Sequence, residues 1–406
     1  MNYILITGGE LFNKGAQAMT FTVITEMNKR FKDKEIVLLS RKDFDREQSD
    51  KNRYNFKILP WNMAIKSYLL GGRYSLIASL KDRKKYMEFK PIFSEIKAVI
   101  QNAFIMIDIS GYSLSSQTSK RSVIGYISNI MVAKKFNIPM WLFPQSFGPF
   151  EFIGPYKWLN KGIIKRYLKY PKRIFVREEN GYKELMQYTD EELTNIMIMP
   201  DIVLQSNSDY NISSIYNDKN INLCFESVEK NALGIIPNMR VVERVGESKI
   251  LDIYQRIILA LLEKGKHIYI LKHSFEDGNI CANIKKTYPK EDRVVLMDND
   301  YNCIQLEGII QKFDYIIGSR YHSIIHAFKN GVPAIAIGWA VKYKELMNKF
   351  EQDRFVLNIS NDMSINSVLS SIDEMDKSYI IEKSKILEIV KEIQKHDVFD
   401  IVEQSI

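Results

Sequence analysis

The chain has 406 residues, more than one ordinary hydrophobic core accommodates, so two domains are expected. Hydrophobic residues make up 46% of the chain and charged residues 26%, which fits a folded soluble protein and excludes a disordered one. The formal net charge of +8 favours an anionic partner without distinguishing a small ligand, a membrane surface or nucleic acid.

The amino terminus, MNYILITGG, is typical of a buried strand and not of a signal peptide, because it lacks a basic leader and its apolar run is short. No run of 18 apolar residues occurs, so no membrane-spanning helix is predicted. The 3 cysteines are scattered and follow no metal-ligand or disulfide spacing. A cytoplasmic protein without a metal site is therefore expected.

The first half of the chain alternates between apolar strands and amphipathic helices. Strands are predicted at 3–6, 36–39, 104–109, 140–143, 174–176 and 196–199, and helices at 16–31, 122–136 and 182–188. Residues 44–97 are predicted to form irregular structure with helices near 62–80 and 91–101. The glycine-rich turn after the first strand matches neither common nucleotide-binding motif.

The alternation restarts after a Ser/Asn/Asp-rich linker at 207–220. Strands are predicted at 221–225, 233–236, 267–271, 294–297, 314–318, 334–337 and 354–357, with helices at 249–264, 302–312, 363–375 and 380–396. The pattern indicates an α/β protein of two Rossmann-like domains facing a cleft, a GT-B-like arrangement. We expect domains at 1–207 and 221–380, with a helix in 381–406 packing back on the first domain.

The unit 313–338 combines a short strand, a loop, a helix and a second strand, and its loop carries Arg320 and His322. The arginine offers a planar charged fork that suits phosphate or carboxylate. The histidine can exchange a proton near neutral pH. The helix start adds free backbone N–H groups. This loop is therefore predicted to be an anion site containing an acid/base group.

Other charged side chains follow other predicted strands, and each has an ordinary structural interpretation beside the functional one. Arg177 and, less directly, Arg240 are further anion ligands, but Arg177 is also placed to form a surface salt bridge with Glu178. Asp108 and Asp201 are candidate bases or simple caps. No hydrolase nucleophile motif is present.

Five segments together resemble the polysaccharide pyruvyltransferase family. They are GGELFNKGAQAM, PQSFGPF, VREENG followed by PDIVL, LKHSFEDGN, and GSRYHSIIHAFKNGVPAIAIG followed by Lys342 and Tyr343. The resemblance extends from about residue 3 to 350. Many relatives carry an acidic residue after the glycine of the first loop, where this chain has Gly15-Ala16-Gln17.

The resemblance implies transfer of pyruvate from phosphoenolpyruvate to a sugar, forming a cyclic ketal without a metal or organic cofactor. It implies that Arg177 and Arg320 hold the donor and that His322 lies beside it. We expect His322 to be the acid/base, with Asp201 or Asp108 activating a hydroxyl. The other expected site residues are Ser319, His273 and Asn238 at the donor, and Asn13, Gly15, Gln17 and Gln145 at the acceptor or in its loops.

The basic segment 156–173 is interleaved with apolar residues, so it is predicted either to contact an anionic membrane near a lipid-linked saccharide or to be an ordinary helix with a solvated basic face. No nucleic-acid-binding motif accompanies the charge.

Two further functions stay open. A nucleotide-sugar glycosyltransferase of the same fold needs an acidic residue for the ribose, and Glu345 is the candidate. A non-catalytic glycan-binding protein is the other, although Arg177, Arg320 and His322 are all present.

Overall fold

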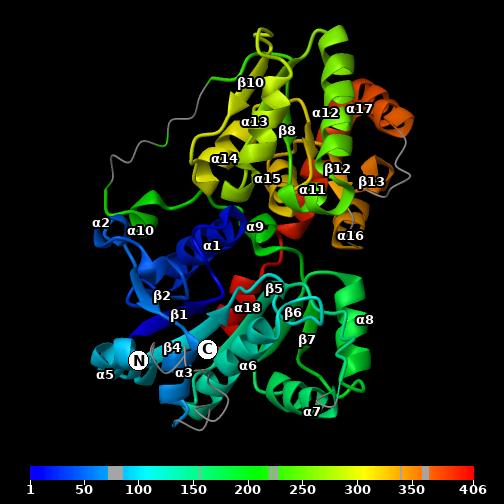
Figure 1. Ribbon diagram of the computed structural model, residues 1–406. Helices are drawn as coiled ribbons and strands as arrows, with labels where there is room; N and C mark the ends of the chain where they lie inside the picture. The colour runs from blue at the N-terminus through cyan, green and yellow to red at the C-terminus, as the bar shows by residue number, and fades with distance from the viewer. Residues whose placement is uncertain (72–85, 155–156, 219–222, 224–226, 339–340, 359–364) are drawn as a thin grey trace.

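The computed structural model describes residues 1–71, 86–154, 157–218, 223, 227–338, 341–358 and 365–406. Two parallel sheets form the centres of two domains, one above the other in Figure 1. The first sheet has the order β3-β2-β1-β4-β5-β6-β7. Its strands are β1 Tyr3–Thr7, β2 Glu35–Ser40, β3 Lys57–Pro60, β4 Ala103–Asp108, β5 Met140–Gln145, β6 Arg173–Val176 and β7 Ile196–Ile198.

The second sheet has the order β10-β9-β8-β11-β12-β13. Its strands are β8 Ala232–Ile236, β9 His267–Leu271, β10 Val294–Met297, β11 Ile316–Gly318, β12 Ala334–Gly338 and β13 Val356–Asn358. In both sheets the strand order reverses beside the first strand, and ligands of such sheets bind at the carboxyl ends of the strands near that reversal. The expected GT-B-like fold with two Rossmann-like domains is confirmed.

Helices connect the strands in both domains. The first domain contains α1 Lys14–Arg30, α2 Gln48–Lys51, α3 Met63–Leu69, α5 Phe93–Gln101, α6 Lys120–Lys135, α7 Lys157–Leu168, α8 Glu179–Tyr188, α9 Ile202–Gln205, α10 Ile212–Ile215, and the 3-10 turns η1 Asp43–Asp45 and η2 Lys90–Ile92. The second contains α11 Met239–Val245, α12 Glu247–Glu263, α13 Gly278–Lys286, α14 Cys303–Ile310, α15 Tyr321–Lys329, α16 Val341–Lys349, and the turns η3 Phe275–Asp277 and η4 Asp353–Phe355. The chain ends in α17 Ile365–Ile393 and α18 Val398–Gln404.

Alternate residues of the first sheet face two different cores. Ile4 and Ile6 of β1 belong to one core, whereas Leu5 between them belongs to the other. The core that contains Ile4 continues into the second domain, where it includes Ile317 and Ile335. This shared core fixes the two domains against each other, and with them the loops that meet between the sheets.

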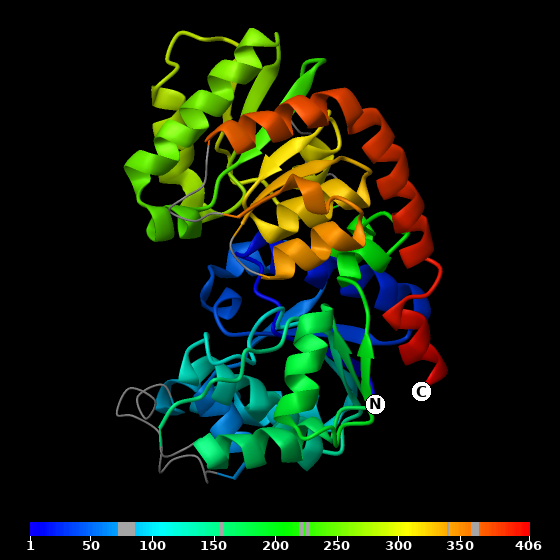
Figure 2. The same ribbon diagram turned by 90° about the vertical axis from the view of Figure 1, so that its right-hand side faces the viewer.

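The carboxyl-terminal segment links the domains a second time. Figure 2 shows α17 running along the upper domain and down its side to α18, which lies beside the lower domain. Phe399 of α18 packs edge-on against Phe143 of β5, with ring centroids 5.4 Å apart. Arg30 of α1 pairs with Asp400 at 2.6 Å and Asp397 at 3.3 Å. The end of the chain therefore belongs to the packing of the first domain.

Some details differ from the sequence-based expectation, and others lie outside the described residues. Strand β3 was not predicted, because it is a four-residue edge strand that ends in Pro60 and exposes Lys57. The two predicted carboxyl-terminal helices are one continuous helix, α17, up to Ile393. Of the helix predicted at 62–80, the described part is α3, and most of the strand predicted at 221–225 lies outside the described residues.

Candidate functional site

Loops from both sheets meet at the seam between the domains. In the first domain, β5 leads to Ser146, β6 to Arg177, and β7 to Asp201. In the second, β11 leads to Arg320 and His322. Because the strands of each sheet are parallel, the loops that follow them lie at the same edge of that sheet. The structure brings Arg177, Asp201 and His322 together there, and it directs Arg320 elsewhere.

Arg177 is the centre of this cluster. Its side chain is only 4% exposed, and it donates to Asp201 Oδ2 at 2.7 Å, Glu178 Oε1 at 3.0 Å and Ser146 Oγ at 2.6 Å. Its guanidinium carbon also lies 4.6 Å from the ring centroid of Tyr321 in the other domain. A buried charge needs such pairing. The salt bridge with Glu178 exists, but it is buried and not a surface pair.

His322 lies in the first turn of α15, beside Asp201. Its Nε2 is 3.6 Å from Asp201 Oδ2, too far for a hydrogen bond, and it finds no hydrogen-bond partner in the described chain. Burial, followed by the positive charge of Arg177, lowers the pKa of His322 well below its ordinary value. The imidazole is therefore neutral at physiological pH, with one ring nitrogen left for a substrate.

Gly15 of the first loop touches the same imidazole from the other domain. A Cβ atom at this position would lie 2.3 Å from His322 Nδ1, far inside van der Waals contact. The Asn13 side chain caps α1 by accepting from the backbone N–H groups of Gly15 and Ala16. The absence of a side chain at residue 15 therefore permits the close approach of the two domains at His322.

Arg320 forms a separate ion-pair group. Its Nε donates to Asp277 Oδ2 at 2.8 Å, and its Nη2 binds both Asp277 and Glu276, the latter at 2.6 Å. Asp277 is fully buried and also accepts from Met239 N. Two carboxylates therefore bind the guanidinium group of Arg320, which was expected to hold the donor together with Arg177.

Lys342, at the start of α16, is a second cation at the seam and was not among the predicted site residues. Its amine lies 5.2 Å from the ring centroid of Tyr321, 5.8 Å from that of Tyr343 and 5.7 Å from that of Tyr112 in the first domain. Burial, with a contribution from Arg177, lowers the pKa of Lys342 to about 8. The sequence shows Lys342 shortly after the second strand of the 313–338 unit, but nothing there indicates that its side chain is buried at the seam.

Several expected donor residues support the loop that carries Arg320. Asn238 donates to Ser319 O at 2.8 Å and caps α11 by accepting from Arg240 N. Tyr343 donates to the same Ser319 oxygen at 2.9 Å, and the Ser319 hydroxyl faces Tyr254 Oη at 3.2 Å. These hydrogen bonds show that Asn238 and Ser319 hold the backbone of the loop that carries Arg320.

His273 is the remaining expected donor residue. It is buried, with its ring centroid 6.0 Å from that of His326, and its Nε2 has no partner in the described chain. Burial, assisted by the charges around it, lowers the pKa of His273 well below its ordinary value. His273 is thus a neutral imidazole on the same side of the seam as Arg320.

Two other candidates are held away from His322. Asp108 is buried and accepts from Thr7 Oγ1, Asn129 Nδ2 and Ser110 N, so it ties β4 to β1 and α6. Arg240 is exposed and pairs with Glu243 on its own helix. The structure therefore does not bring Asp108 or Arg240 into the cluster around Arg177.

The remaining loop candidates make structural contacts. Gln145 is buried at the end of β5, where its Nε2 donates to Phe143 O and its backbone carbonyl oxygen accepts from Arg177 N. Gln17 crosses the seam and accepts from Cys303 N at 2.8 Å. Glu345 also crosses it, accepting from Asn180 N at 2.9 Å. One oxygen of the carboxylate expected to bind a ribose is therefore already engaged.

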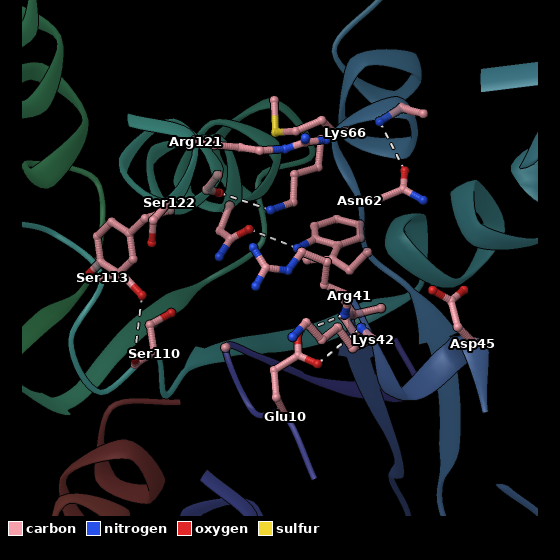
Figure 3. A pocket seen from close by; sticks show the side chains of 18 of the residues that line it. Glu10, Arg41, Lys42, Asp45, Asn62, Lys66, Ser110, Ser113, Arg121 and Ser122 are labelled. Carbon is pink, nitrogen blue, oxygen red and sulfur yellow. Dashed lines mark hydrogen bonds between the residues drawn. The ribbon is translucent and has the colours of Figure 1, made fainter. Parts of the chain in front are cut away.

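A cavity of about 720 Å³ opens in the first domain alone, at the carboxyl ends of β1, β2 and β4 (Figure 3). Its wall combines charged, aromatic and hydroxyl side chains, including Glu10, Arg41, Trp61, Lys66 and Ser110. Asp108 lies behind this wall, since its partner Asn129 also lines the cavity.

The basic helix α7 makes ion pairs on its surface. Lys161 and Lys165 pair with Asp190, and Lys165 and Lys169 pair with Glu192. These pairs fit a solvated basic face. Among the described residues, no helix is long and apolar enough to cross a membrane. No group of three metal-ligating side chains occurs in that part of the chain either.

Comparison with solved structures finds the same architecture in proteins of very different sequence. MnaA of S. aureus in a structure with UDP is 10% identical, with a TM-score of 0.55 over 95% of this chain and 91% of that one. The UDP-GlcNAc 2-epimerase of Methanocaldococcus jannaschii is 12% identical, with a TM-score of 0.54 over 92% of each chain. Anabaena HepE in complex with UDP is 10% identical, with a TM-score of 0.54 over 100% and 99%. At such identities the similarity establishes the fold alone.

Comparison of the sequence with protein families is more specific. No curated protein sequence matches significantly. The family model described as polysaccharide pyruvyl transferase, however, matches residues 13–340, which include Gly15, Arg177, Asp201 and the loop with Arg320 and His322. The match confirms the resemblance drawn from the five motifs, and the chain belongs to the polysaccharide pyruvyl transferase family.

Proposed function

We propose that the protein transfers a pyruvyl group from phosphoenolpyruvate to two hydroxyls of one sugar, forming a cyclic ketal and releasing inorganic phosphate. One observation carries the proposal beyond family membership: the neutral imidazole of His322 presents an unpartnered Nε2 beside Arg177, Asp201 and Lys342. This arrangement suits a donor with two anionic groups and a reaction that moves protons.

The reaction balances without an oxidant or reductant. The methylene carbon of the donor gains a proton and becomes a methyl group, which leaves an oxocarbenium-like centre at the neighbouring carbon. A first sugar hydroxyl attacks that centre, the bond to the phosphate oxygen breaks, and a second hydroxyl closes the ring. Of the two hydroxyl protons, one replaces the proton delivered to the methyl group and the other leaves with phosphate.

The residues at the seam divide these tasks. Lys342 and Arg177 provide positive charge for the phosphate and carboxylate. Burial and, after it, the charge of Arg177 lower the pKa of His322 in the free protein. An anionic donor counteracts these positive charges, so the imidazole takes up a proton as the donor binds and then delivers it to the methylene carbon. Asp201, 3.6 Å away, stabilises the charged imidazole. Arg320 has no task in this scheme, because Asp277 and Glu276 bind its guanidinium.

Phosphate release tests the proposal. The protein is incubated with phosphoenolpyruvate and a panel of oligosaccharides, and inorganic phosphate and the mass of each glycan are measured. Phosphate release with a pyruvyl ketal on the glycan supports the proposal. Release of a nucleoside diphosphate from a sugar nucleotide, with no phosphate from phosphoenolpyruvate, supports a glycosyltransferase. Glycan binding without either product supports a binding protein.

The proposal requires a sugar acceptor but does not define its carrier. Lipid linkage of that acceptor, a cytoplasmic location and contact of α7 with an anionic membrane surface stay predictions. Flotation of the protein with vesicles containing anionic lipid, compared with neutral vesicles, tests the last of them.

A further inference from the structure

The cavity of the first domain contains a buried lysine that pairs with no carboxylate among the described residues. Lys66 is 5% exposed, and its amine donates to Gly125 O at 2.9 Å while lying 5.3 Å from the Trp61 ring centroid. In the described part of the chain, Lys66 forms no ion pair with a carboxylate. A buried ammonium without a counter-charge is costly, so its retention beside an open cavity calls for an explanation.

The carboxylates nearest to Lys66 are committed to other bonds. Both oxygens of Glu10 are engaged, by Ser40 Oγ and by the backbone N–H groups of Arg41 and Lys42. Asp108 is engaged by Thr7, Asn129 and Ser110. Neither acid therefore neutralises the amine by direct contact.

A second cation faces the same space. Figure 3 shows the side chains of Lys66 and Arg41 directed into one hollow, with Asp45 at its edge. Burial lowers the pKa of Lys66 to about 7; the positive charge of Arg41 acts in the same direction, and the negative charge of Asp108 opposes it. Two cations that repel each other across a cavity are a binding arrangement for an anion placed between them.

Two loops connect this cavity to the residues at the seam. The loop after β1 lines the cavity with Gly8 and Glu10 and reaches His322 with Gly15. The loop after β4 lines it with Ser110, and the next carbonyl, Gly111 O, accepts from Ser146 N at 2.8 Å. The Ser146 hydroxyl in turn binds Arg177. Residues of both loops thus line the cavity at one point of the loop and contact the seam at another.

We propose that this cavity holds the acceptor of the reaction, and that Lys66 and Arg41 bind an anionic group, a phosphate or a carboxylate, that the acceptor carries. The identification of the ligand as the acceptor rests on the proposed function, whereas the assignment of the cavity as an anion site does not. Trp61, 4% exposed and fixed by a 2.8 Å bond from its Nε1 to Asn129, supplies the aromatic part of the wall. The class of acceptor is therefore an acidic or phosphorylated saccharide.

The chain offers a matched control for the lysine. Lys66 on α3 donates to Gly125 O on α6, and Lys135 on α6 donates to Leu69 O on α3 at 2.7 Å. Both lysines therefore tie the same two helices together. Lys66 lines the cavity and Lys135 does not. Lys66→Met and Lys135→Met each remove a lysine amine and a hydrogen bond between the same two helices, at a buried position that lines the cavity and at an exposed position that does not.

The test is a calorimetric titration with three probes in the presence of saturating phosphoenolpyruvate, which occupies the donor site. The probes are methyl β-glucuronide, glucose 1-phosphate and the neutral methyl β-glucoside. At least one charged probe is expected to bind the parent, to bind Lys66→Met about tenfold more weakly or worse, and to bind Lys135→Met as the parent does. The charged probe that binds distinguishes a carboxylate from a phosphate.

Three results would overturn the inference: equal binding of charged probes by the parent and Lys66→Met, equal losses in both lysine variants, or no binding of either charged probe. Lys66→Arg keeps the charge and should retain binding. Arg41→Gln, at an exposed position, should weaken it up to about fivefold even if Lys66→Met fails to fold. The titration is repeated without phosphoenolpyruvate, so that the anion site is measured independently of the donor. Failure of the proposed function is recognised separately, because the protein then neither binds phosphoenolpyruvate nor releases phosphate from it.

Discussion

Gly15 of the first domain and His322 of the second touch across the seam, so that a single added carbon at residue 15 would overlap the imidazole. The contact joins the start of α1 to the start of α15. It sets the position of the proposed acid/base group relative to the loop that leads to the acceptor cavity. The domain seam and the proposed chemistry are therefore linked at one pair of residues.

Gly15→Ala tests that contact. The added methyl group must displace His322 or the first loop, so a loss of stability of about 1–3 kcal/mol and a marked fall in activity are expected. Gly162→Ala is the control, because a Cβ atom there meets no other atom within 4 Å and lies on the exposed side of α7. Urea unfolding and phosphate release measure the two effects. A fully active and stable Gly15→Ala protein would show that the contact is not required.

His322→Gln tests the proposed acid/base role. The substitution keeps a polar side chain but removes the titratable imidazole, so kcat should fall by about 10²–10⁴, a larger effect than the one on the Kd for phosphoenolpyruvate. His396→Gln, at an exposed position, is the control and should behave as the parent. Turnover by His322→Gln at the parental rate would remove His322 from the mechanism.

Proton uptake gives a second measure of His322. Because burial and Arg177 lower its pKa in the free protein, the imidazole is neutral at pH 6.5, and binding of the anionic donor should raise its pKa and draw a proton from solution. Calorimetry in two buffers of different ionisation enthalpy measures this uptake. It should be close to one proton for the parent and close to zero for His322→Gln. Equal uptake by both proteins assigns the proton to another group.

Lys342 should give donor binding a dependence on pH. With a pKa of about 8, its amine is charged below that pH and neutral above it. The Kd for phosphoenolpyruvate should therefore rise more steeply as the pH passes 8, in addition to the rise at lower pH that proton uptake by His322 causes. Lys342→Met should bind about tenfold more weakly and lose the rise above pH 8. Exposed Lys344→Met is the control. The same pH profile in Lys342→Met and the parent would exclude this role.

Arg177 should contribute to stability as well as to binding. Arg177→Met leaves the buried carboxylates of Asp201 and Glu178 without their partner, and a loss of about 3–5 kcal/mol is expected. A triple variant with Asp201→Asn and Glu178→Gln should recover part of that loss, because the buried negative charges are then absent. Urea unfolding measures both. If the triple variant is no more stable than Arg177→Met, the ion pairs do not account for the loss.

The sequence was sufficient to predict the two sheets and the loops at their carboxyl ends. The spacing of apolar residues, the glycines in turns and the helix-capping residues are all local features of the chain. It placed Arg177, Asp201 and His322 in different loops, and the fold brings them into contact. The direction of a long side chain is a property of its surroundings. Arg320 turns towards Asp277, which sequence spacing does not reveal.

The cavity around Lys66 was missed for a related reason. It lies partly within 44–97, where no strand was expected, and its existence depends on how β3, α3 and α6 assemble. Lys342 was noted only as part of a motif, because nothing in its local sequence indicates burial among Tyr112, Tyr321 and Tyr343.

Donor binding at the seam is tested most directly by a thermal-shift titration of the parent and Lys342→Met with phosphoenolpyruvate and, separately, UDP-glucose. Phosphoenolpyruvate at 100 times its Kd should stabilise the parent by about 2.7 kcal/mol, a shift of a few degrees. Lys342→Met should shift less at the same concentration, and UDP-glucose should have no effect on either protein. Stabilisation by UDP-glucose with none by phosphoenolpyruvate would contradict the donor assignment and favour a glycosyltransferase.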